Sequence, residues 1–312
     1  SPGDEILCVV SGKFGQRWAQ IAEIYGIHVH RWELDWGEAL DLQTFEQQLR
    51  ARPGLNAVLT QACETSTGTL HPIEKMAEVV RKNTTGLFMV DAITAVGCTP
   101  VQMDEWGLDV VVAGSQKAFG LPVGLSFVAL SENAWQAAEE ARCPRFYLDL
   151  KRERSANEAG QTLFSSNVTL IRALAPVLKE MHTNGLEHGF RRCATLAKAT
   201  QVAAVSLGLE VFSKAPSPSV TALSLPEKTD GVAFRQRLED DYSVCVMGGQ
   251  DHLKGKILRV GHMGAISNQD ILTFVRSLAK VMRNFGLPNA TSHHESEAVA
   301  KAQSVLEMGS NV

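Results

Sequence analysis

The sequence predicts an α/β protein with a doubly wound, mostly parallel sheet, followed by a smaller α/β domain nearer the C-terminus. Between residues 6 and 130, short apolar runs rich in β-branched residues alternate with longer segments of helical period. This alternation is typical of βαβ units that form a parallel sheet. After residue 135 a charged stretch gives way to one rich in serine and asparagine, which indicates a crossing to a second domain.

The first part of the chain supplies six predicted strands. Each is a short apolar run, at residues 6–10, 27–31, 57–60, 87–90, 110–113 and 126–130. Helices are predicted where apolar residues recur three or four positions apart, at residues 16–25, 42–50 and 72–82. Pro72 stands at the start of the last helix, where its missing N–H removes no helical hydrogen bond.

The second part of the chain has the pattern of a smaller domain. Helices are predicted at residues 170–182, 187–206, 231–240 and 268–285, and strands at 220–224 and 256–260. We therefore predict a large domain over residues 1–182, a small domain over 183–287 and a polar, weakly helical tail over 288–312. The spaced apolar residues of the tail, Val299, Val305 and Leu306, suit docking on a partner or on the protein itself, and the sequence leaves both open.

Charge and hydropathy exclude some classes of partner. The 30 basic and 34 acidic residues nearly balance, without a basic run that could follow a nucleic-acid backbone. The longest apolar stretches are far shorter than the roughly 20 residues that span a bilayer. We expect neither nucleic acid nor membrane as a partner.

The six cysteines stand singly, with no CxxC pair, which favours a reducing compartment such as the cytoplasm or an organelle stroma. His293 and His294 are adjacent in the polar tail without further ligands, so we predict no metal site. The chain enters its first strand directly after Ser-Pro-Gly-Asp, with nothing that resembles a signal peptide. We expect that an N-terminal segment is missing, which leaves any targeting signal unreadable.

Three polar features follow predicted strands, where open α/β sheets bind their ligands. Asp91 closes the apolar run 87–90, and its carboxylate can pair with a cationic ring nitrogen. Taken alone, such an aspartate is more often a helix N-cap. Lys117 ends the segment 114–117 after another apolar run. Partial desolvation there would lower its pKa and let the free amine form a Schiff base, although a lone lysine is usually solvated.

The third feature is the loop 64–68, which reads Glu-Thr-Ser-Thr-Gly. It gathers hydroxyls and backbone N–H groups that can hold a phenolate or carboxylate, or simply cap a turn. With residues 11–18, 90–92 and 248–261, these segments resemble the class V aminotransferases, the family of alanine–glyoxylate and serine–glyoxylate aminotransferases. The resemblance extends to about Phe285 and is closest to the cyanobacterial-type members named as soluble hydrogenase small subunits. The 26 positions between Asp91 and Lys117 agree with the family.

The resemblance implies a PLP-dependent transferase of fold type I, acting as a homodimer with pyridoxal 5'-phosphate as cofactor. It implies that Lys117 holds the cofactor and moves the α-proton, and that Asp91 keeps the pyridine nitrogen protonated. Arg259 matches the arginine that grips the substrate carboxylate. The remaining implied cofactor contacts are Phe14 and Ile93 on the two ring faces, Thr65 at the phenolic oxygen, Gln116 at the phosphate or ring edge, and Ser165, which reaches the phosphate from the partner subunit.

The implied reaction moves an amino group from alanine or serine to a 2-oxo acid such as glyoxylate. One alternative is a non-catalytic structural relative that kept the fold and lost the phosphate loop, which in the family lies in the missing N-terminal segment. A second is the cysteine desulfurase reaction. That family usually has a histidine on the ring face and another before the lysine, where this chain has Phe14 and Gln116.

Overall fold

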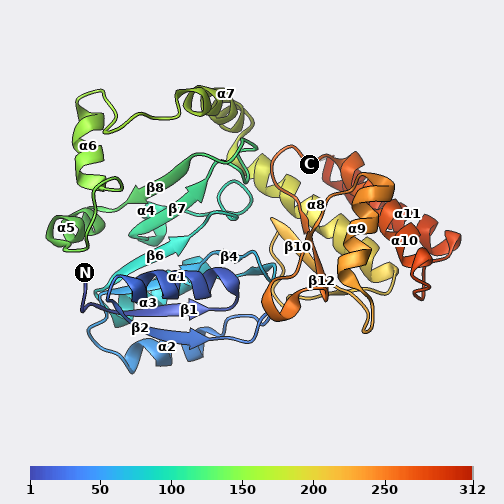
Figure 1. Cartoon of the computed structure of the whole chain (residues 1–312), viewed down its shortest axis with the longest axis horizontal. Coiled ribbons are helices and arrows are strands. Elements are labelled where there is room, and N and C mark those ends of the chain that lie inside the picture. The colour runs from blue at the N-terminus through green and yellow to red at the C-terminus, as the bar shows by residue number, and fades with distance from the viewer. Residues whose placement is uncertain (311–312) are drawn as a thin grey trace.

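The computed structural model describes residues 1–310, which form a six-stranded sheet and a smaller four-stranded sheet (Figure 1). The larger sheet has the order β2-β1-β3-β6-β7-β8, in which only β8 is antiparallel to its neighbour. The strands are β1 (Glu5–Val10), β2 (His28–Glu33), β3 (Ala57–Gln61), β6 (Leu87–Asp91), β7 (Val110–Gly114) and β8 (Ser126–Leu130). The predicted doubly wound, mostly parallel sheet is confirmed, with strand boundaries that differ by at most two residues.

Strand side chains alternate between the two faces of this sheet, so both faces carry apolar residues. Helices cover both faces and bury these residues. On one face Ile6, Cys8 and Val10 pack against α1 (Lys13–Ile24). On the other face Leu7 and Val9 belong to a core that includes α2 (Leu42–Arg50) and α3 (Ile73–Asn83). The short helix α4 (Met103–Trp106) adds Trp106 to that core. The central strands β1, β3, β6 and β7 are mostly buried, whereas the edge strands β2 and β8 are partly exposed.

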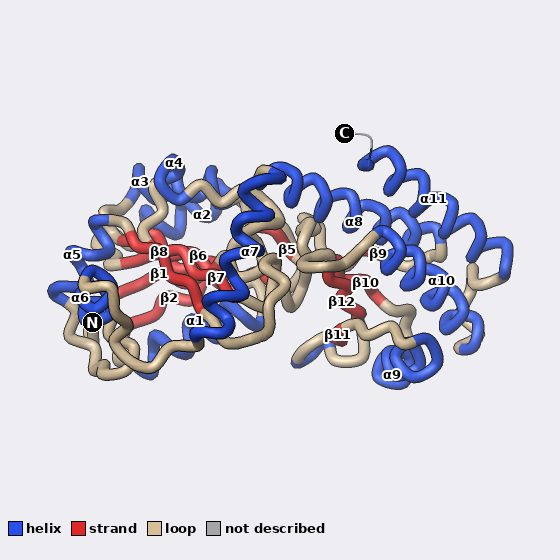
Figure 2. The backbone as a smooth tube through the Cα atoms, turned by 90° about the horizontal axis from the view of Figure 1, so that it is seen from above, coloured by secondary structure: helices blue, strands red, loops and turns tan. Residues whose placement is uncertain are grey.

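The smaller sheet is antiparallel, with the order β11-β12-β10-β9. Its strands are β9 (Glu210–Val211), β10 (Val220–Ser224), β11 (Met247–Gly248) and β12 (Ile257–Gly261). The helices α8 (Leu186–Ser206), α9 (Gly231–Tyr242) and α10 (Asn268–Asn284) share a separate hydrophobic core with it. Figure 2 shows the two groups of strands side by side, with α7 (Val168–Asn184) leading into α8 between them.

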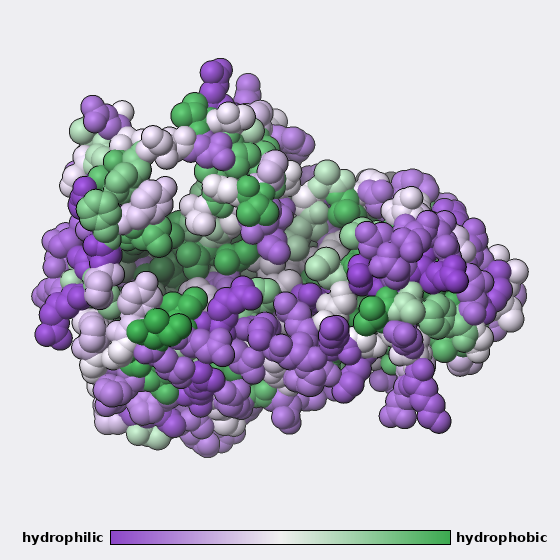
Figure 3. Space-filling view, viewed as in Figure 1, coloured by the Kyte–Doolittle hydropathy of each residue, from purple (hydrophilic) through white to green (hydrophobic). Residues whose placement is uncertain are grey.

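The segment between the sheets contains structure that periodicity did not predict. The charged stretch that follows β8 forms α5 (Glu132–Glu140) and α6 (Leu150–Glu158), which begin at the N-caps Ser131 and Asp149. A two-stranded hairpin, β4 (Cys63–Glu64) with β5 (Thr69–Leu70), follows β3. Figure 3 shows the surface hollowed beside the α6–α7 segment, with hydrophobic residues on the floor of the hollow.

The C-terminal residues form α11 (Ser292–Ser310), which packs against α8. Ala298, Ala302 and Leu306 are buried in the core of the smaller sheet. Of the two possibilities that the sequence left open, the tail therefore docks on the protein itself. Within residues 1–310, no helix has the length and apolar character that a bilayer span requires.

A buried histidine links the carboxyl ends of β1 and β3, which are neighbouring strands of the parallel sheet. His71 is 2% exposed, and its ring nitrogens lie 3.1 Å from Ser11 Oγ and 3.3 Å from Thr60 Oγ1. Burial lowers the pKa of His71 from 6.5 to about 4. The folded protein therefore keeps this ring neutral under mildly acidic conditions.

The depressed pKa of His71 predicts a loss of stability in mild acid. Between about pH 6.5 and pH 4 the unfolded state binds a proton at this residue and the folded state does not, so the free energy of unfolding falls as pH falls. His71 contributes at most about 3 kcal/mol to this loss. Urea unfolding at pH 7 and pH 4.5 measures it. The pH dependence should become shallower in His71→Asn, and an unchanged slope would contradict the assignment.

Candidate active site

The carboxyl ends of four neighbouring parallel strands bring the predicted site segments to one edge of the large sheet. α1 with Phe14 follows β1, the loop with Thr65 follows β3, Asp91 ends β6, and Lys117 follows β7. The register pairs Gln61 of β3 with Asp91, and Asp91 with Val112 of β7. β2 and β3 lie on opposite sides of β1, so the chain reverses its winding between β1 and β3, which is where doubly wound sheets bind ligands.

Asp91 is a buried carboxyl group, 6% exposed. Its Oδ1 accepts a hydrogen bond of 3.0 Å from the backbone N–H of Ile93. Burial raises the pKa of Asp91 from 3.8 to about 6, and the Glu64 carboxylate acts in the same direction, while Lys117 and Arg17 lower it. A cation placed beside Asp91 would favour its ionised form.

Lys117 is half-buried, and burial is the main cause that lowers the pKa of its amine. The nearby Arg259 guanidinium lowers the pKa of Lys117 further, whereas Cys63 and Asp91 raise it. Lys117 and Asp91 thus lie close enough to influence each other's ionisation, in surroundings that disfavour both charges. A larger fraction of such an amine is unprotonated at neutral pH than of a solvated lysine, so it is available as a nucleophile and as a general base.

Arg259 connects the small sheet to the strand ends of the large one. It lies on β12 and is 8% exposed. Its Nε donates to Gly248 O at 2.9 Å and its Nη1 donates to Thr65 O at 3.1 Å. Burial lowers the pKa of Arg259, although the Glu64 carboxylate opposes this shift. The arginine reaches the loop that follows β3 from 194 positions further along the chain.

The other residues predicted to contact the cofactor differ in how far they are buried. Thr65 Oγ1 lies 2.8 Å from Thr94 Oγ1. Phe14 is half-buried in the first turn of α1, with the Arg17 guanidinium 5.2 Å from its ring centroid. Ile93 is half-buried, whereas Gln116 is exposed.

Ser165 is exposed on the loop between α6 and α7. Among residues 1–310 no hydrogen bond joins its side chain to Asp91, Lys117 or Arg259. This position is compatible with the prediction that Ser165 serves the site of a second subunit, a prediction that a single chain does not test.

Sequence reasoning assigned no role to three residues of this region. Glu64 is fully buried and accepts backbone N–H groups from α1. Thr94, 3% exposed, lies between Thr65 and the carbonyl of Cys63. Arg17 lies over Phe14 and is close enough to lower the pKa of Asp91. Glu64 could have been found from its place in the loop motif, since a carboxylate at a strand end needs donors.

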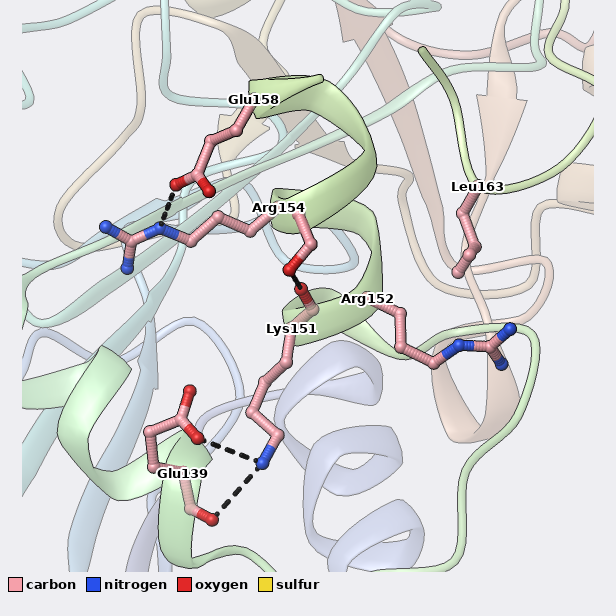
Figure 4. Close-up of a pocket in the computed structure, with 7 residues that line it drawn as sticks. Glu139, Lys151, Arg152, Arg154, Glu158 and Leu163 are labelled. Carbon is pink, nitrogen blue, oxygen red and sulfur yellow. Dashed lines mark hydrogen bonds and ion pairs between the residues drawn. The ribbon is translucent and has the colours of Figure 1, made fainter. Parts of the chain in front are cut away.

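A separate groove of about 670 Å³ lies along α6 (Figure 4). Four of its five charged side chains form pairs: Lys151 Nζ lies 3.1 Å from Glu139 Oε2, and Arg154 Nε lies 3.1 Å from Glu158 Oε1, whereas Arg152 lies over the Phe146 ring. Exposed pairs of this kind contribute little binding energy. The groove lacks the buried, converging groups found at the strand ends, so we assign the candidate site to the latter.

Residues 1–261 match the family model described as aminotransferase class-V. The chain belongs to the class-V aminotransferase family. It is 37% identical over 311 residues to the soluble hydrogenase small subunit of Synechococcus sp. (strain PCC 6716). This alignment covers 98% of this chain and 80% of that protein. It is 31% identical over 316 residues to L-aspartate–glyoxylate aminotransferase of Paracoccus denitrificans, with 97% and 80% covered.

Solved structures of this class-V aminotransferase's relatives share its fold. The pyridoxamine-pyruvate aminotransferase of Mesorhizobium loti superimposes with a TM-score of 0.91 at 26% identity, covering 99% of this chain and 79% of that one. The family resemblance and the fold type I architecture inferred from the sequence are therefore confirmed. The family depends on pyridoxal phosphate, and the chain is homologous to aminotransferases.

Proposed function

We propose that this chain is a pyridoxal-phosphate-dependent aminotransferase that moves an amino group from alanine or serine to a 2-oxo acid such as glyoxylate. One observation carries the proposal: a half-buried amine, Lys117, and a buried carboxyl group, Asp91, influence each other's pKa at the strand ends, with Arg259 beside them. The glyoxylate acceptor is supported by the relative from Paracoccus denitrificans, which is an L-aspartate–glyoxylate aminotransferase.

The donor set of the site fits pyridoxal phosphate. The carboxylate of Asp91 suits a protonated pyridine nitrogen, and the amine of Lys117 suits the aldehyde carbon. Phe14 and Ile93 supply apolar surface for the two ring faces. The hydroxyl of Thr65 suits the phenolic oxygen, and Gln116 and a second subunit's Ser165 would hold the phosphate. When bound, the cofactor supplies an electron-accepting ring that stores the amino group between the two half-reactions.

The protein's own residues have distinct tasks in this proposal. Nζ of Lys117, whose pKa burial lowers, accepts the proton from the substrate's Cα and later returns it. Asp91 stays ionised against the ring nitrogen and keeps that nitrogen protonated. Arg259 exchanges its bonds to Gly248 O and Thr65 O for a bidentate pair with the substrate carboxylate. The substrate's Cα is thereby oriented toward Lys117.

We propose that the active form is a homodimer. Large apolar side chains are exposed between residues 146 and 178, in a stretch that contains α6, most of α7 and Ser165. They are Phe146, Tyr147, Leu148, Leu150, Val168, Ile171 and Leu178. A second copy that covers this segment would bury apolar surface and bring Ser165 to the neighbouring site.

The proposed domain division places Asp91 and Lys117 in residues 1–182 and Arg259 in residues 183–287, so that the site lies between two domains. The separate hydrophobic cores of the two sheets support this division, although α11 of the proposed tail, 288–312, shares the second core.

All six cysteines are unpaired, which supports a reducing compartment such as the cytoplasm or an organelle stroma.

Titration of the purified chain with pyridoxal phosphate tests the proposed function. We expect a visible absorption band of bound cofactor, and its conversion to the pyridoxamine spectrum on addition of alanine or serine. Glyoxylate should restore the original band. Conversion by aspartate alone would overturn the proposed donors. Absence of a bound band would favour the non-catalytic structural relative.

A further inference from the structure

The helix that carries Phe14 has no N-terminal cap of its own. The residue at its N-cap is Gly12, which has no side chain to accept the free N–H groups of the first turn. These groups bond instead to a loop about 50 positions away. Lys13 N donates to Ser66 Oγ at 3.0 Å, Phe14 N to Glu64 Oε2 at 3.1 Å, and Gly15 N to the same oxygen at 3.0 Å.

Glu64 is buried completely and is fully used as an acceptor. Its Oε1 receives the N–H of Ser66 at 3.1 Å and the hydroxyl of Ser66 at 2.6 Å. A buried carboxylate is costly unless hydrogen bonds and positive charge compensate it. Here the positive end of α1 and the nearby Arg259 provide that compensation. The carboxylate thus occupies the helix N-terminus and fixes it against the loop that carries Thr65.

The start of α1 packs so closely on its neighbours that positions 12 and 15 have no space for a side chain. A Cβ atom at position 12 would lie 2.4 Å from Ser66 Oγ and 2.5 Å from Glu64 Cδ. A Cβ atom at position 15 would lie 2.7 Å from Val9 O. Glycine at both positions lets α1 start directly against Glu64 and lie close on the sheet. The direction in which Phe14 leaves the helix is therefore set by the Glu64 carboxylate.

We propose that Glu64 is a positioning residue that holds the first turn of α1 so that Phe14 lies against the face of the pyridoxal ring. The inference rests on the proposed function, because it assigns Phe14 to the cofactor. Glu64 itself touches neither cofactor nor substrate. It acts through Phe14. Because the Glu64 carboxylate also raises the pKa of Asp91, the test must separate this effect of charge from a displaced aromatic side chain.

A double-mutant cycle between Glu64 and Phe14 tests the inference. The substitution Glu64→Gln keeps the size of the side chain but replaces one accepting oxygen by an NH₂ group, which cannot accept the α1 N–H groups. For wild type, Glu64→Gln, Phe14→Ala and the double variant, the dissociation constant of pyridoxal phosphate and the visible circular dichroism of the bound cofactor are measured. We expect each single variant to bind about ten-fold more weakly. The double variant should be no weaker than Phe14→Ala.

Controls separate this inference from the proposed function. Glu74→Gln, an exposed glutamate in the first turn of α3, should leave both readouts unchanged. If Glu64→Gln does not fold, Ser66→Ala, which releases Lys13 N, takes its place in the cycle. Effects that multiply in the double variant, or wild-type affinity in Glu64→Gln, overturn the inference alone. A wild-type chain that binds no pyridoxal phosphate overturns the proposed function with it.

Discussion

Replacing Lys117 by alanine is expected to abolish transamination, with a loss of turnover of at least about 10⁴-fold, and to remove the visible band of bound cofactor. The substitution deletes the amine that, in the proposed function, holds the cofactor and moves the α-proton. The half-buried position and lowered pKa of Lys117 make it the amine suited to both tasks. Steady-state kinetics and absorption spectra of the purified variant provide the measurement.

A matched lysine controls for the loss of a positive charge. Lys151 on α6 pairs with Glu139 on the surface, so Lys151→Ala should keep both activity and spectrum. A Lys117→Ala variant that retains a tenth of wild-type turnover would show that another group performs the chemistry.

The second large effect is expected for Asp91→Asn, which should lower kcat by about 10²–10³-fold. The amide has the shape of the carboxyl group and still accepts the Ile93 N–H, which spans 3.0 Å in the wild type, so the fold should persist. It carries no negative charge, so it would no longer keep a bound pyridine nitrogen protonated, and the electron-accepting chemistry that the cofactor supplies would weaken. Stopped-flow measurement of the first half-reaction isolates this step.

Asp104→Asn serves as the control for Asp91, because Asp104 is exposed in the first turn of α4. It should behave as wild type. If Asp91→Asn reacts within three-fold of the wild-type rate, the carboxylate does not support the ring, and its burial has only a structural role.

Local sequence pattern was enough to predict most of the parallel sheet. Apolar runs such as 57–60 and 110–113 are four residues long and contain β-branched side chains. Runs of this kind are typical of the buried strands of a parallel sheet. The hairpin of β4 and β5 and the short strands β9 and β11 were not predictable in this way. Each of these strands has two residues, too few to show a period, and each is held by pairing with the next or the preceding strand of the chain across a turn or loop.

Site residues could be predicted where their position after an apolar strand is informative by itself. They could not be predicted where their role depends on contacts between distant segments of the chain. Asp91 and Lys117 follow apolar strands, so their partial burial follows from sequence. Glu64 accepts hydrogen bonds from residues 49 and 50 positions away, and no sequence spacing predicts such a contact. Arg259 reaches Thr65 only because the second sheet folds against the first. The proposed role of Ser165 lies across a subunit interface, which no local sequence pattern predicts.

Chemical trapping of the cofactor tests the central claim most directly. The purified chain is saturated with pyridoxal phosphate, reduced with borohydride to fix the cofactor to the amine that holds it, digested and mapped by mass spectrometry. The structure predicts a single stoichiometric pyridoxyl label on Lys117, lost when an amino donor is added before reduction. A label spread over exposed lysines, or concentrated on any lysine other than Lys117, would contradict the account.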